Sequence, residues 1–253
     1  MIYITGDTHA DFRRFSTINF PEQYEMTKND YVIICGDFGG VWWRESDKYY
    51  KEQKYWLDWL DDKPFTTLFV DGNHENHELL NEFQWDIYKG GKVHIVRPSV
   101  FHLMRGEMYE INGLKFFTFG GASSHDITDG IIEKDAEGRW REHIKHLNAL
   151  GRYRYRINHY SWWKEELPTE DEITHANETL EKNNWECDFF ISHCCSNSTQ
   201  ALLGCHDHDI LTDYFEEIKY KLHWRKHFFG HYHDNKNLPD DEILIYEQII
   251  QIA

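Results

Sequence analysis

Short apolar runs alternate with segments of helical periodicity along the first part of the chain. Three runs, at residues 2–5, 31–35 and 67–70, are apolar or β-branched throughout, and a glycine follows each within two residues. Runs of this kind are typical of parallel strands that are buried on both faces. Between Asp47 and Asp62 the apolar residues recur at helical spacing instead, and Pro64 follows that segment. This alternation of strand and helix predicts an α/β chain.

A different pattern begins near residue 93, where strand-like pieces follow one another without a helical segment between them. Asn112 and Gly113 separate the last two pieces, and this dipeptide is typical of a two-residue hairpin turn. We therefore expect this part of the chain to be antiparallel. The pieces are Val93–Val96, Val100–Leu103, Met108–Ile111 and Leu114–Phe119.

The stretch from about residue 122 to about residue 185 differs again, because it is rich in arginine, tyrosine and tryptophan. Pro168 and the acidic residues after it predict a helix that runs to about Asn183. We interpret residues 122–185 as an inserted cap on a single domain that spans residues 1–253. Beyond it, the pattern predicts a helix around 212–221, strands at 188–192 and 226–229, and a final pair of strands at 243–246 and 248–252.

Composition and charge narrow the classes of protein to which the chain can belong. Hydrophobic residues make up 40% of the 253 residues, which excludes a disordered chain, and no apolar run reaches the ~18 residues of a membrane helix. The formal net charge of −17 argues against a broad basic face for duplex DNA or an anionic membrane, but it is compatible with a local metal centre. The five cysteines lack disulfide or zinc-site spacing, and the N-terminus lacks a signal-peptide pattern, so we expect a cytoplasmic protein.

Polar clusters of one type follow five of the predicted strands. Each contains a carboxylate, an imidazole or an amide side chain. The carboxyl ends of parallel strands face one crevice, so clusters that are far apart in sequence can meet there. Such side chains are ligands of zinc, iron and manganese, and a carboxylate can bridge two ions about 3.5–4 Å apart that clamp an in-line displacement. The clusters are Gly6–His9, Gly36–Asp37, Gly72–Glu75, Ser192–His193 and Gly230–His233.

These five clusters, in this order, resemble the motifs of the calcineurin-like metallophosphoesterase superfamily. The matching pieces are Gly-Asp-Thr-His at 6–9, Gly-Asp at 36–37, Gly-Asn-His-Glu at 72–75, Ser-His at 192–193 and Gly-His-Tyr-His at 230–233. The resemblance implies a four-layer α-β-β-α sandwich of two mixed sheets, with the site at one edge of the sheets. It also implies a metal-dependent phosphoesterase that hydrolyses phosphomonoesters or phosphodiesters with a metal-bound hydroxide as the nucleophile.

The resemblance further implies a role for each motif residue. The residues that would hold the first ion are Asp7, His9 and His233, and those that would hold the second are Asn73, His193 and His231. Asp37 would bridge both ions. His74 would bind no metal and would be the catalytic residue, either as proton donor to the leaving-group oxygen or by stabilising charge on the phosphoryl group. The two ions would be divalent or trivalent, such as manganese, iron or zinc.

The motif around Asp37 departs from the protein-phosphatase branch of the superfamily. In that branch it continues with a second Asp and an Arg, whereas here it continues with residues 38–40, Phe-Gly-Gly. A carboxylate partner for His74 and a phosphate-gripping arginine are therefore missing at that place, which argues against a Ser/Thr phosphoprotein phosphatase. Residues 120–124, Gly-Gly-Ala-Ser-Ser, are more similar to small bacterial and phage-type members. We expect a phosphorylated small molecule or a nucleotide as the substrate.

Two other functions stay open from the sequence. The segment 139–163 could stack bases and grip phosphates, which would make the protein a metal-dependent nuclease on single strands. It could equally be a packed cap or an oligomer interface, and the acidic residues Glu165 and Glu170 close behind it disfavour nucleic acid. A non-catalytic binding module of the same fold would normally have lost ligands, whereas all seven ligand positions are filled here.

Some of these side chains also have an ordinary structural interpretation. Taken alone, Asp7 and Asp37 could each be a helix cap or a turn residue. His206 and His208 could line the pocket or bind an additional ion, but we interpret them as part of a polar loop that leads into a helix.

Overall fold

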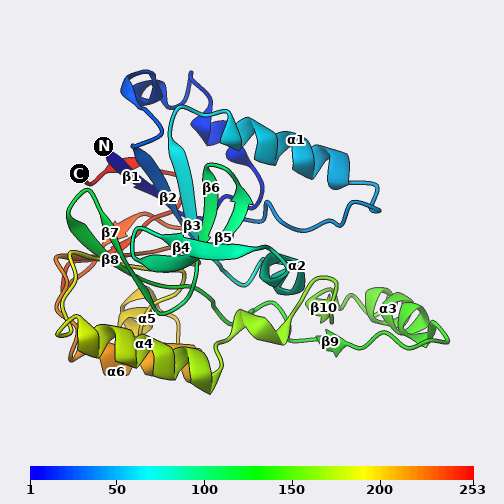
Figure 1. Cartoon of the computed structure of the whole chain (residues 1–253). Helices are drawn as coiled ribbons and strands as arrows, with labels where there is room; N and C mark the ends of the chain where they lie inside the picture. The colour runs from blue at the N-terminus through cyan, green and yellow to red at the C-terminus, as the bar shows by residue number, and fades with distance from the viewer.

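Two mixed β-sheets pack face to face, and helices cover the outer face of each, which gives four layers (Figure 1). The computed structural model describes all 253 residues. The expected α-β-β-α sandwich of two mixed sheets is confirmed. The first sheet contains, in spatial order, β15 (Ile250–Gln251), β1 (Ile2–Thr5), β2 (Tyr31–Cys35), β3 (Thr66–Val70), β6 (Val100–Leu103), β5 (Gly91–Arg97) and β4 (Trp85–Tyr88). The second contains β13 (Lys236–Asn237), β14 (Glu242–Leu244), β12 (Lys226–Phe229), β11 (Phe189–Ser192), β8 (Leu114–Phe119) and β7 (Glu107–Ile111).

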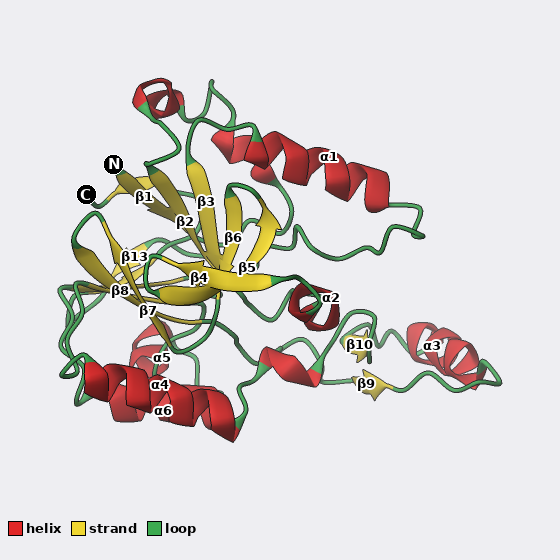
Figure 2. Ribbon diagram, in the orientation of Figure 1, coloured by secondary structure: helices red, strands yellow, loops and turns green.

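The helices divide between the two outer faces (Figure 2). α1 (Tyr50–Asp61) packs on the first sheet, where it contacts β3, β5 and β6. α4 (Glu170–Lys182) contacts β7 of the second sheet, and α6 (Ile210–Lys219) packs in the same layer. The shorter helical segments are η1 (Phe12–Phe15), η2 (Pro21–Glu25), α2 (His77–Asn81), η3 (Lys164–Glu166) and α5 (Asn197–Leu203). None of the helices combines the length and the apolar character that crossing a membrane requires.

The hydrophobic core lies in three layers. Seventeen buried residues fill the space between the sheets, among them Ile4 and Ile33 from the first sheet and Phe116 and Ile191 from the second. Clusters of 16 and 13 buried residues lie beneath α1 and beneath α4 and α6. The central strands are thus buried on both faces, which explains why their sequences are continuously apolar instead of alternating.

The strand pairing confirms one local prediction and corrects another. β7 and β8 form the predicted hairpin, in which Ile111 lies opposite Leu114 and the two turn residues, Asn112 and Gly113, have φ angles of 54° and 78°. The two final strands, which the sequence suggests as a pair, do not pair with each other. β14 joins β12 in the second sheet, whereas β15 joins β1 in the first. β14 (Glu-Ile-Leu) and β15 (Ile-Gln) are both short and mix apolar with polar residues, so only long-range packing decides to which sheet each belongs.

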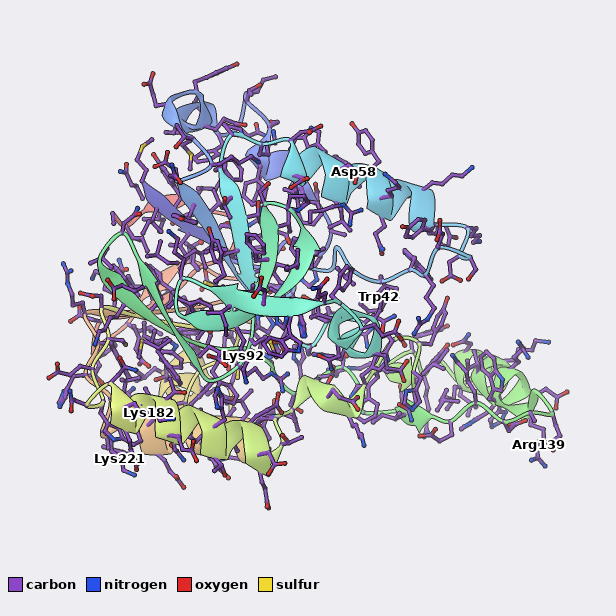
Figure 3. All side chains as sticks on the ribbon, viewed as in Figure 1. Trp42, Asp58, Lys92, Arg139, Lys182 and Lys221 are labelled. Carbon is purple, nitrogen blue, oxygen red and sulfur yellow. The ribbon has the colours of Figure 1, made fainter.

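Residues 125–162, which we call the arm, extend away from the sandwich (Figure 1). They contain a two-stranded parallel sheet, β9 (Gly130–Ile132) and β10 (Tyr155–Ile157), and α3 (Arg139–Ala149). Arg139 lies at the outer end of the arm, far from the two sheets (Figure 3). Within the segment 122–185 that we interpret as an insertion, α4 does not project but packs on the second sheet.

The base of the arm is seated against the first-sheet half of the molecule. The rings of Trp42 and Trp163 meet edge to face with their centroids 5.3 Å apart. His159 of the arm lies against Glu78 of α2, with 2.5 Å between Nδ1 and Oε1. These contacts place the C-terminal end of the arm beside the segments that follow β2 and β3.

Candidate metal centre

All five predicted motif clusters lie at the carboxyl ends of parallel strands. Asp7 follows β1 and Asp37 follows β2, and β3 ends just before Asn73; these three strands are parallel neighbours. His193 follows β11, and His231 begins the loop after β12, its parallel neighbour. Because the two sheets face each other with these strand ends at the same edge, residues from the whole length of the chain meet there.

A first group of ligand atoms gathers around two buried carboxylates. Asp7 and Asp37 are each only 1% exposed. His233 Nε2 lies 3.0 Å from Asp7 Oδ2, and His9 Nε2 lies 3.8 Å from the same oxygen. His9 Nε2 is also 3.7 Å from Asp37 Oδ2. One ligand atom from each of these four residues lies within 4.8 Å of all the others, which is close enough for one metal ion to be shared among them.

A second group of ligand atoms lies on the other oxygen of Asp37. His193 Nε2 is 3.2 Å from Asp37 Oδ1 and 3.3 Å from Asn73 Oδ1. His193 Nδ1 is 2.8 Å from the carbonyl oxygen of Cys35, so Nδ1 carries the donated proton of that bond. The ring of His231 lies edge-on to that of His193, with centroids 5.0 Å apart. Asp37 therefore has one carboxylate oxygen toward each group.

The electrostatics of the edge favour a bound cation. Burial opposes ionisation of Asp7, but His193 and His233 nevertheless lower the pKa of its carboxyl group. Burial alone would lower the pKa of His193, yet Asp37 and Asp7 raise it to about 10. Burial lowers the pKa of His231 to about 3, which keeps its imidazole neutral and its lone pair available. Two adjacent buried carboxylates thus draw positive charge to this point.

One atom of the edge shows directly that the residues suit a metal ion. Asp7 Oδ2 is buried and accepts no hydrogen bond, although His233 Nε2 lies 3.0 Å away. A buried carboxylate oxygen without a partner is unfavourable unless a cation or water satisfies it. Carboxylate, imidazole and amide oxygen together form a donor set suited to manganese, iron or zinc. The cluster can therefore bind metal.

The backbone is strained where the predicted ligands lie. His9, Asp37, His231 and His233 all have positive φ angles, of 46°, 43°, 70° and 50°. Such angles cost roughly 1–3 kcal/mol for residues other than glycine and gather at functional sites. The strain turns these side chains toward the edge of the sheets instead of along their strands.

Two of the motif glycines are required by close approach. A Cβ atom on Gly36, whose φ is +88°, would lie 2.1 Å from Nδ1 of His193. A Cβ atom on Gly230 would lie 2.1 Å from Oδ1 of Asp7. The glycines of these motifs therefore leave the space that the ligand side chains occupy.

His74 lies next to the ligands without joining either group. Its backbone N–H donates to Asp37 Oδ1 at 2.8 Å, and its ring lies 5.2 Å from that of His9, between centroids. Burial lowers the pKa of His74, and the charge of Asp37 opposes this shift. The ring makes no hydrogen bond to the protein, so its nitrogens are free to face a substrate.

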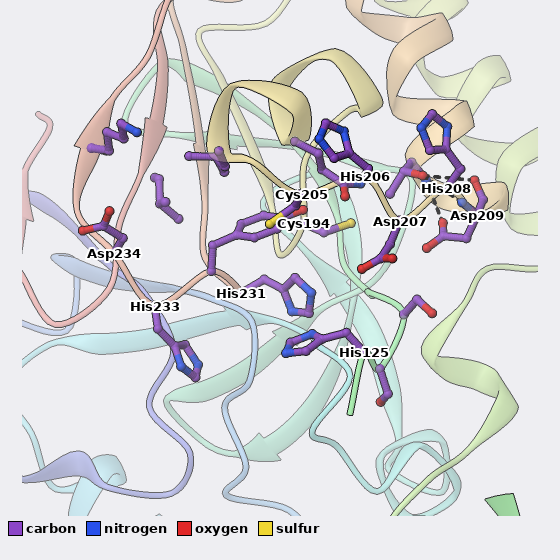
Figure 4. Close-up of a pocket in the computed structure, with 18 of the residues that line it drawn as sticks. His125, Cys194, Cys205, His206, Asp207, His208, Asp209, His231, His233 and Asp234 are labelled. Atoms are coloured by element: carbon purple, nitrogen blue, oxygen red, sulfur yellow. Dashed lines mark hydrogen bonds between the residues drawn. The ribbon is translucent and has the colours of Figure 1, made fainter. Parts of the chain in front are cut away.

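A cavity of about 870 Å³ opens beside His231 and His233 (Figure 4). His125 and Arg154 from the arm line it, and the His125 ring lies 5.3 Å from that of His231. His206 and His208 line the opposite wall of the cavity, in the loop before α6, and Asp209 caps the N-terminus of that helix. Neither histidine belongs to a group of metal-ligand atoms. The sequence-based interpretation of these two histidines as a polar loop fits that position.

Sequence reasoning overlooked Ser124 and Glu166, which lie just outside the two ends of the arm. The side chain of Asn73 contacts Ser124, and Ser124 contacts Glu166. Ser124 belongs to the Gly-Gly-Ala-Ser-Ser segment that resembles small members of the superfamily, but Glu166 is hidden in a run of acidic residues. No spacing in the sequence connects these two residues.

The chain matches the family model described as calcineurin-like phosphoesterase over residues 1–235. It is 29% identical over 145 residues to lariat debranching enzyme A from Xenopus laevis, which covers 53% of this chain and 26% of that protein. Lariat debranching enzymes from Arabidopsis thaliana (34% over 101 residues, 36% of this chain and 23% of the relative) and Drosophila melanogaster (26% over 164 residues, 59% and 29%) are also similar. The chain spans about a quarter of the length of these curated relatives. The family match extends over all five motifs whose side chains meet at the edge of the two sheets, and the chain belongs to the calcineurin-like phosphoesterase family.

Proposed function

We propose that the protein is a phosphoesterase that uses two metal ions. The observation that carries this proposal is the position of Asp37. One of its carboxylate oxygens lies 3.7 Å from His9 Nε2, and the other lies 3.2 Å from His193 Nε2. A carboxylate between two sets of ligand atoms is suited to bridge two ions, and two adjacent ions are suited to clamp an in-line displacement at phosphorus.

The chain's own residues divide the work between binding and chemistry. The residues proposed to hold the first ion are Asp7, His9 and His233, those proposed for the second are Asn73, His193 and His231, and Asp37 is shared. When bound, ions such as manganese, iron or zinc supply Lewis acidity and an activated water. His74 donates its ring N–H to a phosphoryl oxygen or to the leaving-group oxygen, because its ring nitrogens have no partner in the protein.

Two observations favour a phosphodiester over a phosphomonoester. A diester carries a second organic group on phosphorus, and the cavity of about 870 Å³ beside His231 has room for one. The similarity of the chain to lariat debranching enzymes supports the same choice.

A reducing compartment such as the cytoplasm suits this protein, because all five cysteines are free thiols.

Hydrolysis of a chromogenic phosphodiester and of the matching monoester, with manganese and with a chelator, tests the proposal. We expect the manganese-loaded protein to hydrolyse the diester, and the chelator to abolish turnover. Asp37→Asn should lower kcat/KM by at least about 100-fold, the scale on which catalysis depends on a single electrostatic group. Full turnover by Asp37→Asn with metal bound would contradict the assigned role. Turnover of the monoester alone would make the protein a phosphatase.

A second candidate function is cleavage of single-stranded nucleic acid, and the cations in the second half of the arm favour it. The arm as a whole is nearly neutral, with seven arginines and lysines and six acidic residues. Residues 138–160 contain six arginines and lysines and a single acidic residue, within a chain of net charge −17. The side chains of Arg141, Lys145 and Arg154 are exposed and form no ion pair, although the backbone N–H of Arg154 donates to the Asp129 carboxylate at 2.9 Å. Cations beside exposed tyrosines are suited to hold a single strand by its phosphates and bases.

A further inference from the structure

A network of buried, hydrogen-bonded polar side chains begins at Asp71, two residues before the predicted ligand Asn73. Asp71 Oδ2 accepts hydrogen bonds from Arg105, at 3.0 Å from Nε and 2.5 Å from Nη2. Nη2 of the same guanidinium donates to the carbonyl oxygens of Glu165 and Glu166, at 2.8 Å and 3.3 Å. The arginine therefore ties the loop after β3 to the segment that follows the arm.

The chain of contacts then returns to Asn73. The Glu166 carboxylate accepts two hydrogen bonds from Ser124, one from the backbone N–H at 2.9 Å and one from the hydroxyl at 2.6 Å. The Asn73 Nδ2 group donates to Ser124 Oγ at 3.3 Å. The path starts at Asp71 and ends at Asn73, and the backbone of residues 71–73 closes it into a ring. Each of these side chains belongs to a residue that is at most 9% exposed.

The donor and acceptor pattern of the ring fixes which way the Asn73 amide points. A serine hydroxyl has one hydrogen, and Ser124 gives it to the Glu166 carboxylate, so its oxygen can only accept from Asn73. The amide must therefore turn its NH₂ group toward Ser124. Its oxygen, Oδ1, is then the atom that faces His193 Nε2, at 3.3 Å. An amide turned the other way would present hydrogens to a cation.

We propose that Ser124 and Glu166 are positioning residues that hold the Asn73 amide with its oxygen toward the second metal position. The inference rests on the proposed function, because it needs an ion at that position. Ser124 precedes the arm and contacts Asn73, and Glu166 follows the arm and contacts Ser124, so residues at both ends of the arm are linked to a proposed metal ligand. Such outer partners of a ligand commonly change metal affinity by about 10–100-fold.

Titration of Mn²⁺ into metal-free protein, followed by calorimetry, tests the inference with Ser124→Ala. We expect one of the two ions to bind about 10–100-fold more weakly and the other to change by less than about 3-fold. Ser123→Ala is the matched control, because that neighbouring side chain makes no hydrogen bond to the protein and should leave both affinities unchanged. A loss of fold stability would weaken the binding of both ions together. The ratio of the two affinities therefore separates a positioning effect from a general structural effect.

A second set of variants tests the orientation itself. In Asn73→Asp the side chain ends in two equivalent oxygens, so its orientation no longer matters, and adding Ser124→Ala should weaken binding by less than about 3-fold. Glu166→Gln, which removes one of the two acceptors of Ser124, should act in the same direction as Ser124→Ala. Wild-type affinities for both ions in Ser124→Ala and Glu166→Gln would overturn the inference and leave the proposed function intact. Failure of the wild-type protein to bind Mn²⁺ would overturn both.

Discussion

The edge of the sandwich, where the predicted ligands meet, and the arm differ in how many buried hydrophobic residues support them. At the edge, the predicted ligands end strands that are backed by clusters of 17, 16 and 13 buried residues. In the arm, Ile132 and Leu147 are the only buried hydrophobic residues, and neither belongs to any of these clusters. The geometry of the proposed metal centre is thus fixed by the whole fold, whereas the arm depends on local contacts.

The two regions also differ in charge. The edge gathers two buried carboxylates, which draw cations, while residues 138–160 carry an excess of arginine and lysine. A phosphate ester is itself anionic, so the acidic chain needs cations wherever substrate approaches. We infer that the edge supplies them through bound metal and the arm through side chains. Variants in each of the two regions test this division.

The largest effect is expected at the edge, for His74→Ala. Removing a group that donates to the reacting oxygens typically lowers turnover by about 10²–10⁴-fold. The metal content should stay near that of the wild type, because His74 belongs to neither ligand group. Steady-state kinetics on a chromogenic diester, together with metal analysis of the same samples, measures both quantities. Loss of both metals in His74→Ala would make this residue a ligand or a structural residue instead.

Truncating one buried leucine in each region, Leu180 of α4 and Leu147 of α3, compares how much the sandwich and the arm contribute to stability. Leu180 of α4 is fully buried against the second sheet, and Leu147 of α3 is 5% exposed within the arm. Leu180→Ala should lower the free energy of unfolding by about 2–5 kcal/mol, the usual cost of such a cavity. Leu147→Ala should change global unfolding by less than about 1 kcal/mol, and instead reduce amide hydrogen-exchange protection in the arm. Equal losses in urea unfolding would show that the arm and the sandwich form one cooperative unit.

The sequence predicts the edge well and the arm poorly, for physical reasons. Strand ends such as Asp7 and Asp37 follow buried apolar runs, so local pattern and topology are sufficient to bring them together. The partners of β14 and β15 cannot be predicted this way, because both runs fit either sheet. The link from Asn73 to Glu166 depends on residues 93 positions apart that meet only through the arm's base. A local pattern carries no information about such contacts.

The pH dependence of stability should also come from the sandwich. Glu242 of β14 is 1% exposed and accepts hydrogen bonds from Thr199 Oγ1 at 2.6 Å and Lys219 Nζ at 2.9 Å. Burial opposes its ionisation, but His227, Lys219 and Thr199 together lower its pKa to about 2. Its stabilising effect is therefore fully present above pH ~4.5, the ordinary value for glutamate, and is lost as the pH falls toward 2.

Glu242→Gln tests this assignment. The variant should lose about 2 kcal/mol of unfolding free energy at pH 5, and the difference from the wild type should shrink by about half at pH 3. Glu137→Gln is the control in the arm, since the pair that Glu137 forms with Arg139 is exposed and should contribute almost nothing. Urea unfolding at the two pH values measures both variants. A Glu242→Gln difference that does not change with pH would contradict the assignment.

The smallest effect is expected from the charge of the arm, and it bears on the second candidate function. Reversing two exposed, unpaired cations of α3, in Arg141→Glu/Lys145→Glu, should weaken binding of a short single-stranded oligonucleotide by about 10-fold at low salt. The variant Lys51→Glu/Lys221→Glu makes the same change of net charge on other faces and should weaken binding far less. Hydrolysis of a small chromogenic diester should be unchanged in both variants, because neither pair lies at the edge of the sheets. Equal oligonucleotide affinities, measured by fluorescence anisotropy across a salt series, would show that the arm does not bind nucleic acid, since a long-range effect of net charge alone cannot distinguish the two pairs. A loss confined to the arm variant would instead assign the contact to α3, and would indicate that substrate approaches the metal centre along the arm.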